Sequence, residues 1–577
     1  MLKSKLCLLI ALLCMALSAT GASGLSSEEP VIEIHADRVL IYPQRMTLTG
    51  EETLLDLLLM FPDQMQTGFD KMIDAYNLRL DNSPLNGNTR LLCSQLKAKD
   101  ISLVQICDNT GVAKGTIGMG RVIDINLLPV KNCAHGFVSA QYGTDNIIAP
   151  SAQVVVGSEN TDIFANASYT YQDKFAQQKN DQYLALYMTN RFSSHDCLQT
   201  YFTQQYKDDR AYSANKTVAL TKKYSGKASY FHDFNDRGTE LLILGSYTYI
   251  DIPKTICSET DERMVGTSEK SGYCVVELNT PFYTDKLEMM VGWEGDWNSD
   301  TYRSTTTQAG GNVLLSLEHG YTSSNNDFYL QYNYSPTSCW NFTAGARVMM
   351  FRYSFDGNNF NDTRHNIITS AIYKPTKNHQ IQIGYFHKFF NPSYSVDAVI
   401  SAHDWINMQG KLVACDINEM KMAYTYSRND LNVNITSSYF LRKKGNDGWS
   451  PDSEDYYYID DMWKTSATIT YHTGMLNIIA GANYYWQKND DNYAVFTLAP
   501  TLSLPCQLQI APRVVFFTSN ISGVSRLAAL PYEDSPRTYA SLQVNKQLGK
   551  HFDLTANWHD IFSSRYSAAL IGIQYRF

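Results

Sequence analysis

Histidine–aspartate neighbours are the residues of this chain whose chemistry is easiest to envisage. Such pairs could support general acid–base catalysis, and they occur at His232–Asp233, His403–Asp404 and His559–Asp560. Neighbouring residues of a β-strand point to opposite faces, so adjacent partners rarely act together. The sequence also contains no HExxH zinc motif, no GxSxG nucleophile elbow and no Walker phosphate loop. We therefore expect no catalytic residues, no metal site and no cofactor.

A glycine-rich stretch is the next candidate, at Gly115–Gly120 (GTIGMG). Its spacing differs from that of a phosphate-binding loop, and it precedes a strand instead of opening a helix. It lies between the β-branched run Ile101–Ile106 and the alternating run Val122–Leu127, inside the glycine-containing loop Asn109–Gly120. The pattern predicts strand, tight loop, strand, with the glycines supplying positive-φ positions.

Two further elements precede this unit. Thr53–Pro62 (TLLDLLLMFP) reads as a helix that Pro62 ends, and Thr49 and Glu52 have the spacing of a capping box at its start. Tyr76–Asn82 (YNLRLDN) reads as a strand that runs into a polar loop. The N-terminal 130 residues therefore predict a small α+β unit.

The N-terminus has the layout of a secretory signal. Lys3 and Lys5 precede the apolar run Leu6–Leu17, and small residues follow at Ser18–Gly24. The run is too short to span a bilayer, which needs ~20 apolar residues. We predict a cleaved signal peptide over residues 1–23. Cys14 raises the alternative of a lipoprotein, but Leu13 stands where a small residue is expected.

Charge and cysteine usage exclude other classes. The 577-residue chain has a formal charge of −9, which argues against nucleic-acid binding. Eleven cysteines are present, and the nine outside the signal peptide are scattered at wide spacings. They form neither a disulfide framework nor a zinc motif. Pairing of Cys257 with Cys274, or of Cys93 with Cys107, remains open.

From Ala134 to Phe577 the chain reads as successive strands of ~9–14 residues with period-two alternation, as in tilted transmembrane β-strands. The last strand places Ile571, Ile573, Tyr575 and Phe577 on one face and Gln574 on the other. A soluble sandwich would have strands of ~5–6 residues. Aromatic residues close the apolar faces, and the terminal Tyr575-Arg-Phe577 is typical of an outer-membrane sorting signal.

Tight turns alternate with longer polar segments along this region. The longer ones include Lys207–Tyr224, Pro253–Lys270 and Ser299–Asn325, which we expect to be extracellular loops. With both barrel ends on the periplasmic side, the segmentation gives about 22 strands. We predict an all-β membrane protein, a roughly 22-stranded antiparallel transmembrane β-barrel, whose lumen is wide enough to require a plug.

The N-terminal pattern resembles the plug domain of TonB-dependent outer-membrane receptors. Their plugs place a helix ending in Pro, a strand running into Asp, a D-I-x-x-I-x-V strand, a Gly turn and a G-x-I-x-I strand in this order. Val104–Ile106 stands where many members have Ile-Glu-Val, and Val122–Asn126 stands where they have a Val-Ile-Asn-Ile strand. The C-terminal region from Ala540 and the segment beginning Asn391-Pro-Ser-Tyr resemble compact Bacteroidetes-type members. The resemblance implies a plug at residues 24–130 inside a barrel at residues 134–577.

The resemblance also implies function. Members bind a ligand at the extracellular mouth and import it when an energising complex pulls on the plug. The implied partners are the TonB–ExbB–ExbD complex, the barrel assembly machinery, the lipid bilayer with lipopolysaccharide, and an unidentified small ligand such as a metal chelate, vitamin or peptide. The implied location is the bacterial outer membrane.

Several plug residues are candidates for function. The segment that contacts TonB by β-addition would comprise Val31, Ile32, Glu33 and Ile34, unless this segment is the first strand of the plug. Inward barrel positions are rich in Gln, Asn, Thr and Arg, so we expect a polar, hydrated interface with the plug. The residues expected to act there are Arg79, Asp81, Asn82, Arg90, Gly111 and Gly115.

Two alternatives stay open. A plugged barrel that is uncoupled from TonB would serve as a surface receptor, adhesin or assembly partner, and the weak TonB-contact pattern favours it. A barrel enzyme would need His, Asp and Ser gathered at the rim.

Overall fold

The computed structural model describes most of the chain from residue 31 onwards. The described residues are 31–34, 39–46, 52–54, 57, 77–80, 83–84, 96–107, 122–128, 133–174, 177–212, 216–235, 238–258, 261–308, 313–355, 358–390, 415–428, 431–442, 462–472, 475–487, 492–518, 538–559, 561 and 568–577. None of the helices within these ranges has the length and apolar character needed to cross a membrane.

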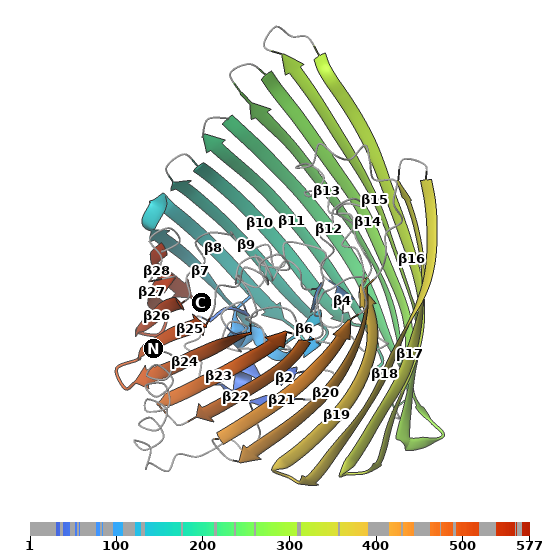
Figure 1. Cartoon of the computed structure of the whole chain (residues 1–577). Helices are drawn as coiled ribbons and strands as arrows, with labels where there is room; N and C mark the ends of the chain where they lie inside the picture. The colour runs from blue at the N-terminus through green and yellow to red at the C-terminus, as the bar shows by residue number, and fades with distance from the viewer. Residues whose placement is uncertain are drawn as a thin grey trace.

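Twenty-two strands, β7 to β28, form a closed antiparallel barrel in which each strand pairs with its neighbours in sequence (Figure 1). The predicted fold class and strand number are confirmed. The strands of the first half are β7 (Cys133–Gly143), β8 (Ile147–Gly157), β9 (Thr161–Lys174), β10 (Gln177–Arg191), β11 (Asp196–Tyr212), β12 (Lys216–Asn235), β13 (Thr239–Cys257), β14 (Asp261–Phe282), β15 (Thr284–Gln308), β16 (Val313–Thr337) and β17 (Trp340–Phe355).

The second half continues in the same way. Its strands are β18 (Asn358–Thr376), β19 (His379–Phe390), β20 (Cys415–Arg428), β21 (Leu431–Arg442), β22 (Met462–His472), β23 (Leu476–Gln487), β24 (Tyr493–Leu504), β25 (Leu508–Phe517), β26 (Thr538–Leu548), β27 (Phe552–His559) and β28 (Ala568–Arg576).

The chain ends close the barrel. Strand β28 pairs with β7, and Phe577 exchanges two backbone hydrogen bonds with Gly136, at 3.1 and 3.2 Å. A Cβ at Gly136 would lie 2.7 Å from the Phe577 ring and 2.3 Å from the carbonyl oxygen of Gln153. Only glycine therefore fits where the last residue of the chain meets the first strand of the barrel.

The two faces of the strands separate as predicted. Ile571, Ile573, Tyr575 and Phe577 are exposed on the outer surface, whereas Gln574 is buried in the lumen. Aromatic side chains stack where the apolar outer band ends, as between Trp340 and Tyr373 with ring centroids 4.4 Å apart. Turns at the rim that holds the chain ends are short, and Gly238 and Gly549 adopt positive φ there.

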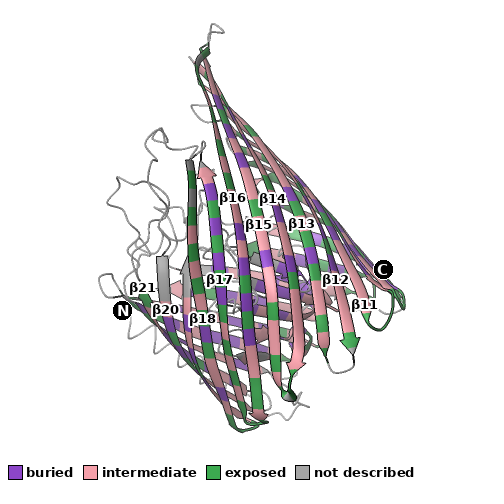
Figure 2. Ribbon diagram, turned by 90° about the vertical axis from the view of Figure 1, so that its right-hand side faces the viewer, coloured by how far each residue is buried: buried purple, intermediate pink, exposed green. Residues whose placement is uncertain are grey.

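The barrel wall is much taller on one side (Figures 1 and 2). Strands β11–β18, the tall wall, have 16 to 25 residues, whereas β26–β28 have 8 to 11. The prediction of long loops at Lys207–Tyr224, Pro253–Lys270 and Ser299–Asn325 is wrong, because most of these residues extend paired strands.

Strand β15 shows why the sequence pattern was misleading. Its outward residues are apolar from Leu287 to Trp297, which matches the ~9–11 residues that a transmembrane strand needs. Above Trp297 the outward positions carry Ser299, Thr301 and Arg303. This part of β15 lies above the apolar band, so its outward side chains do not contact lipid and can be polar. It therefore lacks the alternation of apolar and polar residues that marks a membrane strand, although its backbone pairing continues.

The plug is a separate six-stranded sheet in the order β1–β2–β5–β6–β3–β4. Its strands are β1 (Ile32–Ile34), β2 (Val39–Ile41), β3 (Asn77–Leu80), β4 (Ser83–Pro84), β5 (Ile101–Cys107) and β6 (Val122–Leu127). Leu54 and Leu57 are helical and fully buried against it. Thr49, Pro62 and the glycine loop lie outside the described residues.

Six cysteines within the described part of the chain are free thiols, among them Cys257 and Cys274. A disulfide between these two residues is therefore excluded: they pair across the β13–β14 ladder with Glu262 and Gly245 respectively, and not with each other. Cys93 lies outside the described residues, so its pairing with Cys107 stays untested.

Phe577 offers a test of barrel assembly. Phe577→Asp should sharply reduce membrane insertion, because it removes the aromatic sorting residue and places a charge on the lipid face, where the cost reaches a few kcal/mol with depth. The readout is the amount of heat-modifiable protein in outer-membrane fractions. Phe577→Tyr is the matched control and should insert normally. Parental levels of Phe577→Asp would contradict the role of the terminal residue.

The tall wall offers a second test. Thr301→Cys, on its outward face above the apolar band, should react with a membrane-impermeant maleimide on intact cells. Val291→Cys, within the band, should not react, because lipid covers it. The native exposed thiols Cys133, Cys339 and Cys506 lie at the opposite rim and provide an internal control. Labelling of Val291→Cys alone would refute the placement of the band.

Candidate functional site: the plug–barrel contact

The plug sheet and the barrel share no hydrogen-bonded strand pairing among the described residues. The plug is therefore held by side-chain contacts with the inner wall. These contacts fall into three groups: a charged contact at β14, a polar contact at β7 and β8, and an apolar contact that lies mainly on β8–β11.

Arg79 makes the charged contact. It lies on β3 in parallel register with Asp124 of β6, so the two side chains share one face of the plug sheet. Arg79 is only 5% exposed, and its Nη2 donates to the Tyr273 hydroxyl of β14 at 3.5 Å. Next to it, Lys227 Nζ of β12 donates to the backbone oxygen of Leu80 at 3.4 Å.

Behind Tyr273 the wall holds a buried charge cluster, which we call the Arg347 cluster. Arg347, 1% exposed, donates from Nη2 to Glu294 at 2.7 Å and from Nε to Asp327 at 2.8 Å. Tyr329 lies beside Arg347 and donates to Glu277 at 2.7 Å. The residues come from β14, β15, β16 and β17 and occupy adjacent positions across the ladder.

The cluster explains why a plug cation belongs here. Glu294 and Asp327 both pair with Arg347, and Glu277 accepts a hydrogen bond from Tyr329 beside it. Burying a charge without a partner costs several kcal/mol. The charges of Glu294, Glu277 and Asp124 all act on Arg79. Arg79 therefore adds a positive charge from the plug, beside Arg347 and Lys227 of the barrel, to the part of the inner wall that carries these carboxylates.

The polar contact centres on Asp100 of the plug. Its Oδ2 accepts a hydrogen bond from Gln153 of β8 at 2.6 Å, and its Oδ1 lies 3.5 Å from His135 Nε2 of β7. Lys97 lies over the Phe137 ring, with Nζ 5.1 Å from the centroid. The plug is thus tied to the first barrel strands as well as to the tall wall.

The apolar contact was not expected. The core of the plug, including Ile106 and Ile125, continues without a break into inward side chains of the barrel. Most of these lie on β8–β11 and form the apolar seat: Val155, Phe164, Tyr183, Ala185, Tyr187 and Tyr201. The same cluster also includes Ala423, Ile479 and Ala499 of β20, β23 and β24. The prediction of a wholly polar and hydrated interface is therefore wrong on this side of the lumen.

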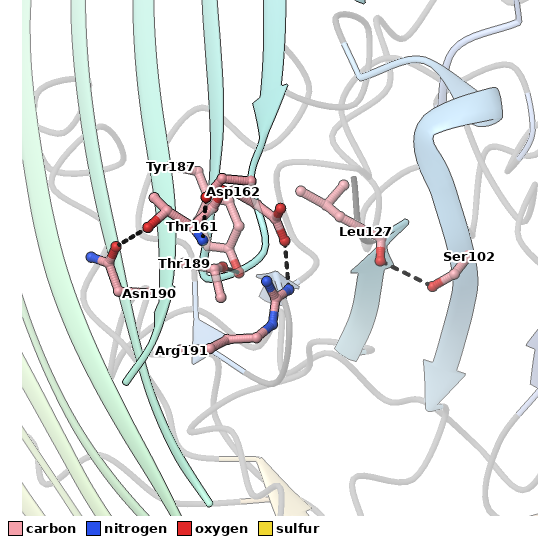
Figure 3. A network of polar contacts seen from close by, with 9 residues as sticks. Ser102, Leu127, Thr161, Asp162, Tyr187, Thr189, Asn190 and Arg191 are labelled. Atoms are coloured by element: carbon pink, nitrogen blue, oxygen red, sulfur yellow. Dashed lines mark hydrogen bonds and ion pairs between the residues drawn. The ribbon is translucent and has the colours of Figure 1, made fainter. Parts of the chain in front are cut away.

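Polar side chains border the apolar seat. Arg191 Nη2 donates to Asp162 at 2.5 Å, and Thr189 donates to the Tyr187 hydroxyl at 3.0 Å (Figure 3). In the same view the plug strands β5 and β6, joined by the hydrogen bond from Ser102 to the Leu127 carbonyl, lie across from this wall. The seat is thus an apolar patch with charged and hydroxylic edges.

The other sequence candidates are distributed more widely. Val31–Ile34 forms or adjoins β1 at one edge of the plug sheet, where the Val31 carbonyl accepts a hydrogen bond from Tyr42 N at 2.9 Å. Tyr575 and Phe577 lie on the outer surface. The remaining plug candidates lie outside the described residues: Asp81, Asn82, Arg90, Gly111 and Gly115.

Sequence reasoning missed the Arg347 cluster, although a signal was present. Arg347 stands in the run Ala344–Phe351 (AGARVMMF), in the middle of an alternating strand at an inward position. A charge at such a position faces the lumen and needs a partner. Asp100 and Asp124 carried no comparable signal, because acidic residues are common in surface loops and strand ends.

Among the His–Asp neighbours, only His232 and Asp233 both lie within the described residues, and each contacts a different partner. His232 Nδ1 contacts Asp196 at 2.8 Å, whereas Asp233 lies 4.0 Å from His195. Asp196 also accepts hydrogen bonds from Tyr230 and Ser193, at 2.5 and 2.7 Å. His403, Asp404 and Asp560 lie outside the described residues. No group of three or more potential metal-binding His, Cys, Asp or Glu side chains occurs in the part of the chain that the structure describes.

No family model and no curated protein matches the sequence. Solved structures do match the fold. The pyoverdine receptor FpvA from Pseudomonas aeruginosa PAO1 aligns with a TM-score of 0.71 at 11% identity, over 96% of this chain and 95% of that one. The alcaligin receptor FauA from Bordetella pertussis gives 0.66 at 12% identity, over 96% of both chains. The copper transporter OprC gives 0.69 at 9% identity, over 96% and 99%.

The chain therefore has the fold of the TonB-dependent outer-membrane receptors, as its sequence predicted. The matched structures are described as receptors and as a transporter. From this likeness of fold we expect an outer-membrane location, with the rim that holds the chain ends facing the periplasm and the tall wall at the extracellular mouth.

Arg79 provides the test of the charged contact. Arg79→Ala should admit large antibiotics and raise single-channel conductance, because the Arg347 cluster loses a counter-charge from the plug. The barrel should still assemble, since its strands pair without the plug. Arg45→Ala is the matched control, because Arg45 pairs with Glu33 inside the plug at 3.8 Å. Conductance of Arg79→Ala equal to that of Arg45→Ala would remove Arg79 from the contact.

Proposed function

We propose that this protein is an outer-membrane receptor that imports a small ligand, with its plug (residues 24–130) displaced from its barrel (residues 134–577) by energy from the TonB–ExbB–ExbD complex. The observation that carries the proposal is the absence of strand pairing between plug and barrel among the described residues. Displacing the plug breaks side-chain contacts only, so the barrel ladder stays intact while a path opens.

The unequal contacts suggest how the plug moves. Water that enters the lumen can solvate Arg79 and the carboxylates as they separate, so the charged contact opens at small net cost. Separating the apolar seat exposes apolar area at roughly 25 cal/mol per Å². We infer that the plug stays on the seat at β8–β11 and opens on the side of β14–β17.

The descriptions of the matched structures support the ligand class that we propose. The matched structures are described as receptors for pyoverdine and alcaligin and as a copper transporter. A small metal chelate, vitamin or peptide at the extracellular mouth is the ligand we propose here, with lipopolysaccharide and the barrel assembly machinery as the partners of any outer-membrane barrel.

One observation favours the alternative of an uncoupled surface receptor, adhesin or assembly partner. The segment Val31–Ile34 does not project from the plug, because β1 pairs along its length with β2. Glu33 also pairs with Arg45. TonB would have to add to the remaining edge of β1 or bind residues 24–30, which lie outside the described residues.

A cross-link separates the two functions. Asp100→Cys and His135→Cys, whose native side chains lie 3.5 Å apart, can be joined by a short bismaleimide in a background lacking the exposed thiols Cys133, Cys339 and Cys506. Cross-linking should abolish energised uptake while leaving ligand binding intact, because the plug can no longer move. Each single-cysteine variant treated with the same reagent is the control.

The ligand is sought first, by growth of a deletion strain under limiting iron, haem, copper, cobalamin or peptide. We expect a growth defect on one source, restored by the parent protein and not by the cross-linked one. Normal growth of the deletion strain on all sources, or full uptake through the cross-linked protein, would refute import and favour the uncoupled receptor.

A further inference from the structure

Two acidic side chains face each other on the inner surface of the tall wall. Glu269 of β14 and Asp300 of β15 are direct register partners, so their side chains share one face. Directly opposite residues in an antiparallel pair have Cβ atoms ~5 Å apart, and like charges at such positions are destabilising. The pair lies beyond Trp297, above the apolar band and on the extracellular side of the Arg347 cluster.

Asp300 is buried without a complete set of partners. It is 7% exposed, and Asn298 donates to its Oδ2 at 3.0 Å. Its Oδ1 has no hydrogen-bond donor among the described residues. Lys223 of β12 acts on Glu269, but no basic group is among the charges that act on Asp300. A buried carboxylate oxygen without a donor is the kind of group that a bound cation satisfies.

Aromatic side chains flank the two carboxylates. Tyr321 of β16 is the register partner of Asp300 on the other side. Tyr302 is the next inward residue along β15, is buried, and stacks on His319 with ring centroids 6.4 Å apart. Arg263 donates to the Tyr302 hydroxyl at 3.4 Å and so lies further towards the rim. Carboxylates beside aromatic rings are the usual recognition set for ammonium and guanidinium groups.

We propose that Glu269 and Asp300, flanked by Tyr302 and Tyr321, bind a guanidinium or ammonium group of the ligand at the extracellular mouth. The inference rests on the proposed function for the identity of its occupant, a cationic organic ligand such as a basic peptide. A metal ion is the less suitable occupant, because no third His, Cys, Asp or Glu joins the pair among the described residues.

The pair also makes binding depend on pH. Burial, together with the charge of Glu269, raises the pKa of Asp300 to about 7, and the hydrogen bond from Asn298 opposes this rise. Asp300 is thus largely protonated below that pH, and a bound cation favours its ionised form. The other titratable and charged groups around it in the described structure are Glu269 and Arg263 on β14, Lys223 on β12, Tyr321 and His319 on β16, and Asp296 and Tyr302 on β15.

Calorimetry on the full-length protein in detergent tests the site. The probes are amidated tri-arginine and the same peptide with citrulline, the neutral isostere of arginine. Tri-arginine should bind at about pH 8 at least tenfold more tightly than the citrulline peptide, and about tenfold more weakly at about pH 6. Asp300→Asn and Glu269→Gln should each reduce affinity at least tenfold, and Asp300→Asn should remove the pH dependence, which a titration of His319 would leave in place.

The matched control is Glu318→Gln, on the outer face of the same wall, whose side chain is 61% exposed. It should bind like the parent. Heat-modifiable mobility checks that each variant folds, and the citrulline and pH comparisons on the parent protein need no variant. Equal binding of both peptides, or unchanged affinity in folded Asp300→Asn, would overturn the proposal. Calcium binding that Asp300→Asn abolishes without affecting tri-arginine would assign the pair to a metal and overturn it as well.

A deletion strain with normal growth would refute import yet leave this binding test unaffected. Failure of the two proposals is therefore distinguishable.

Discussion

Backbone hydrogen bonding in lipid is the constraint on which this structure depends. No water satisfies an unpaired amide in the hydrocarbon region, so strands can cross it only as a closed ladder. Closure pairs β28 with β7, and the backbone hydrogen bonds between Phe577 and Gly136 lie at this closing pair of strands. Twenty-two strands then enclose a lumen wide enough for a second sheet. Because the ladder is complete without that sheet, the plug is held by contacts that can break while the barrel persists.

Those contacts divide the inner wall chemically. On β8–β11 the wall offers the apolar seat, and on β14–β17 it offers the Arg347 cluster, with carboxylates continuing upward to Asp300 and Glu269. A buried ion pair adds little to the stability of a protein overall, because the cost of desolvating both charges offsets the attraction between them. Removing one member is nevertheless costly, because the other is then buried without a partner. Arg79 therefore contributes less to the stability of the barrel than to the position of the plug, which is the property a movable plug requires.

The sequence predicted the elements that obey an alternating pattern and failed where that pattern stops. The alternation at Ile571, Ile573 and Phe577 predicted a lipid-facing surface, and the alternation within Val122–Leu127 predicted a plug strand. Ser299–Gln308 carries polar residues on both faces, since water borders it on one side and the lumen on the other, so it reads as a loop although it is paired throughout. The alternation within its own strand places Arg347 on the lumen side. Its partners Glu294 and Asp327 could not be predicted, because they are set by the register between strands, which the sequence of a single strand does not determine.

The same register accounts for the acidic wall. Glu294 lies opposite Asp327 and Glu269 lies opposite Asp300, so adjacent strands repeatedly bring like charges together along β14–β16. Such pairs weaken a sheet unless cations accompany them. Arg347 accompanies the lower pair from within the barrel, and Arg79 reaches the same region from the plug. At the upper pair Lys223 acts on Glu269, and no basic group is among the charges that act on Asp300. The upper pair is therefore the less compensated of the two, which is why we place the proposed cation of the ligand there, on the same wall that Arg79 of the plug contacts.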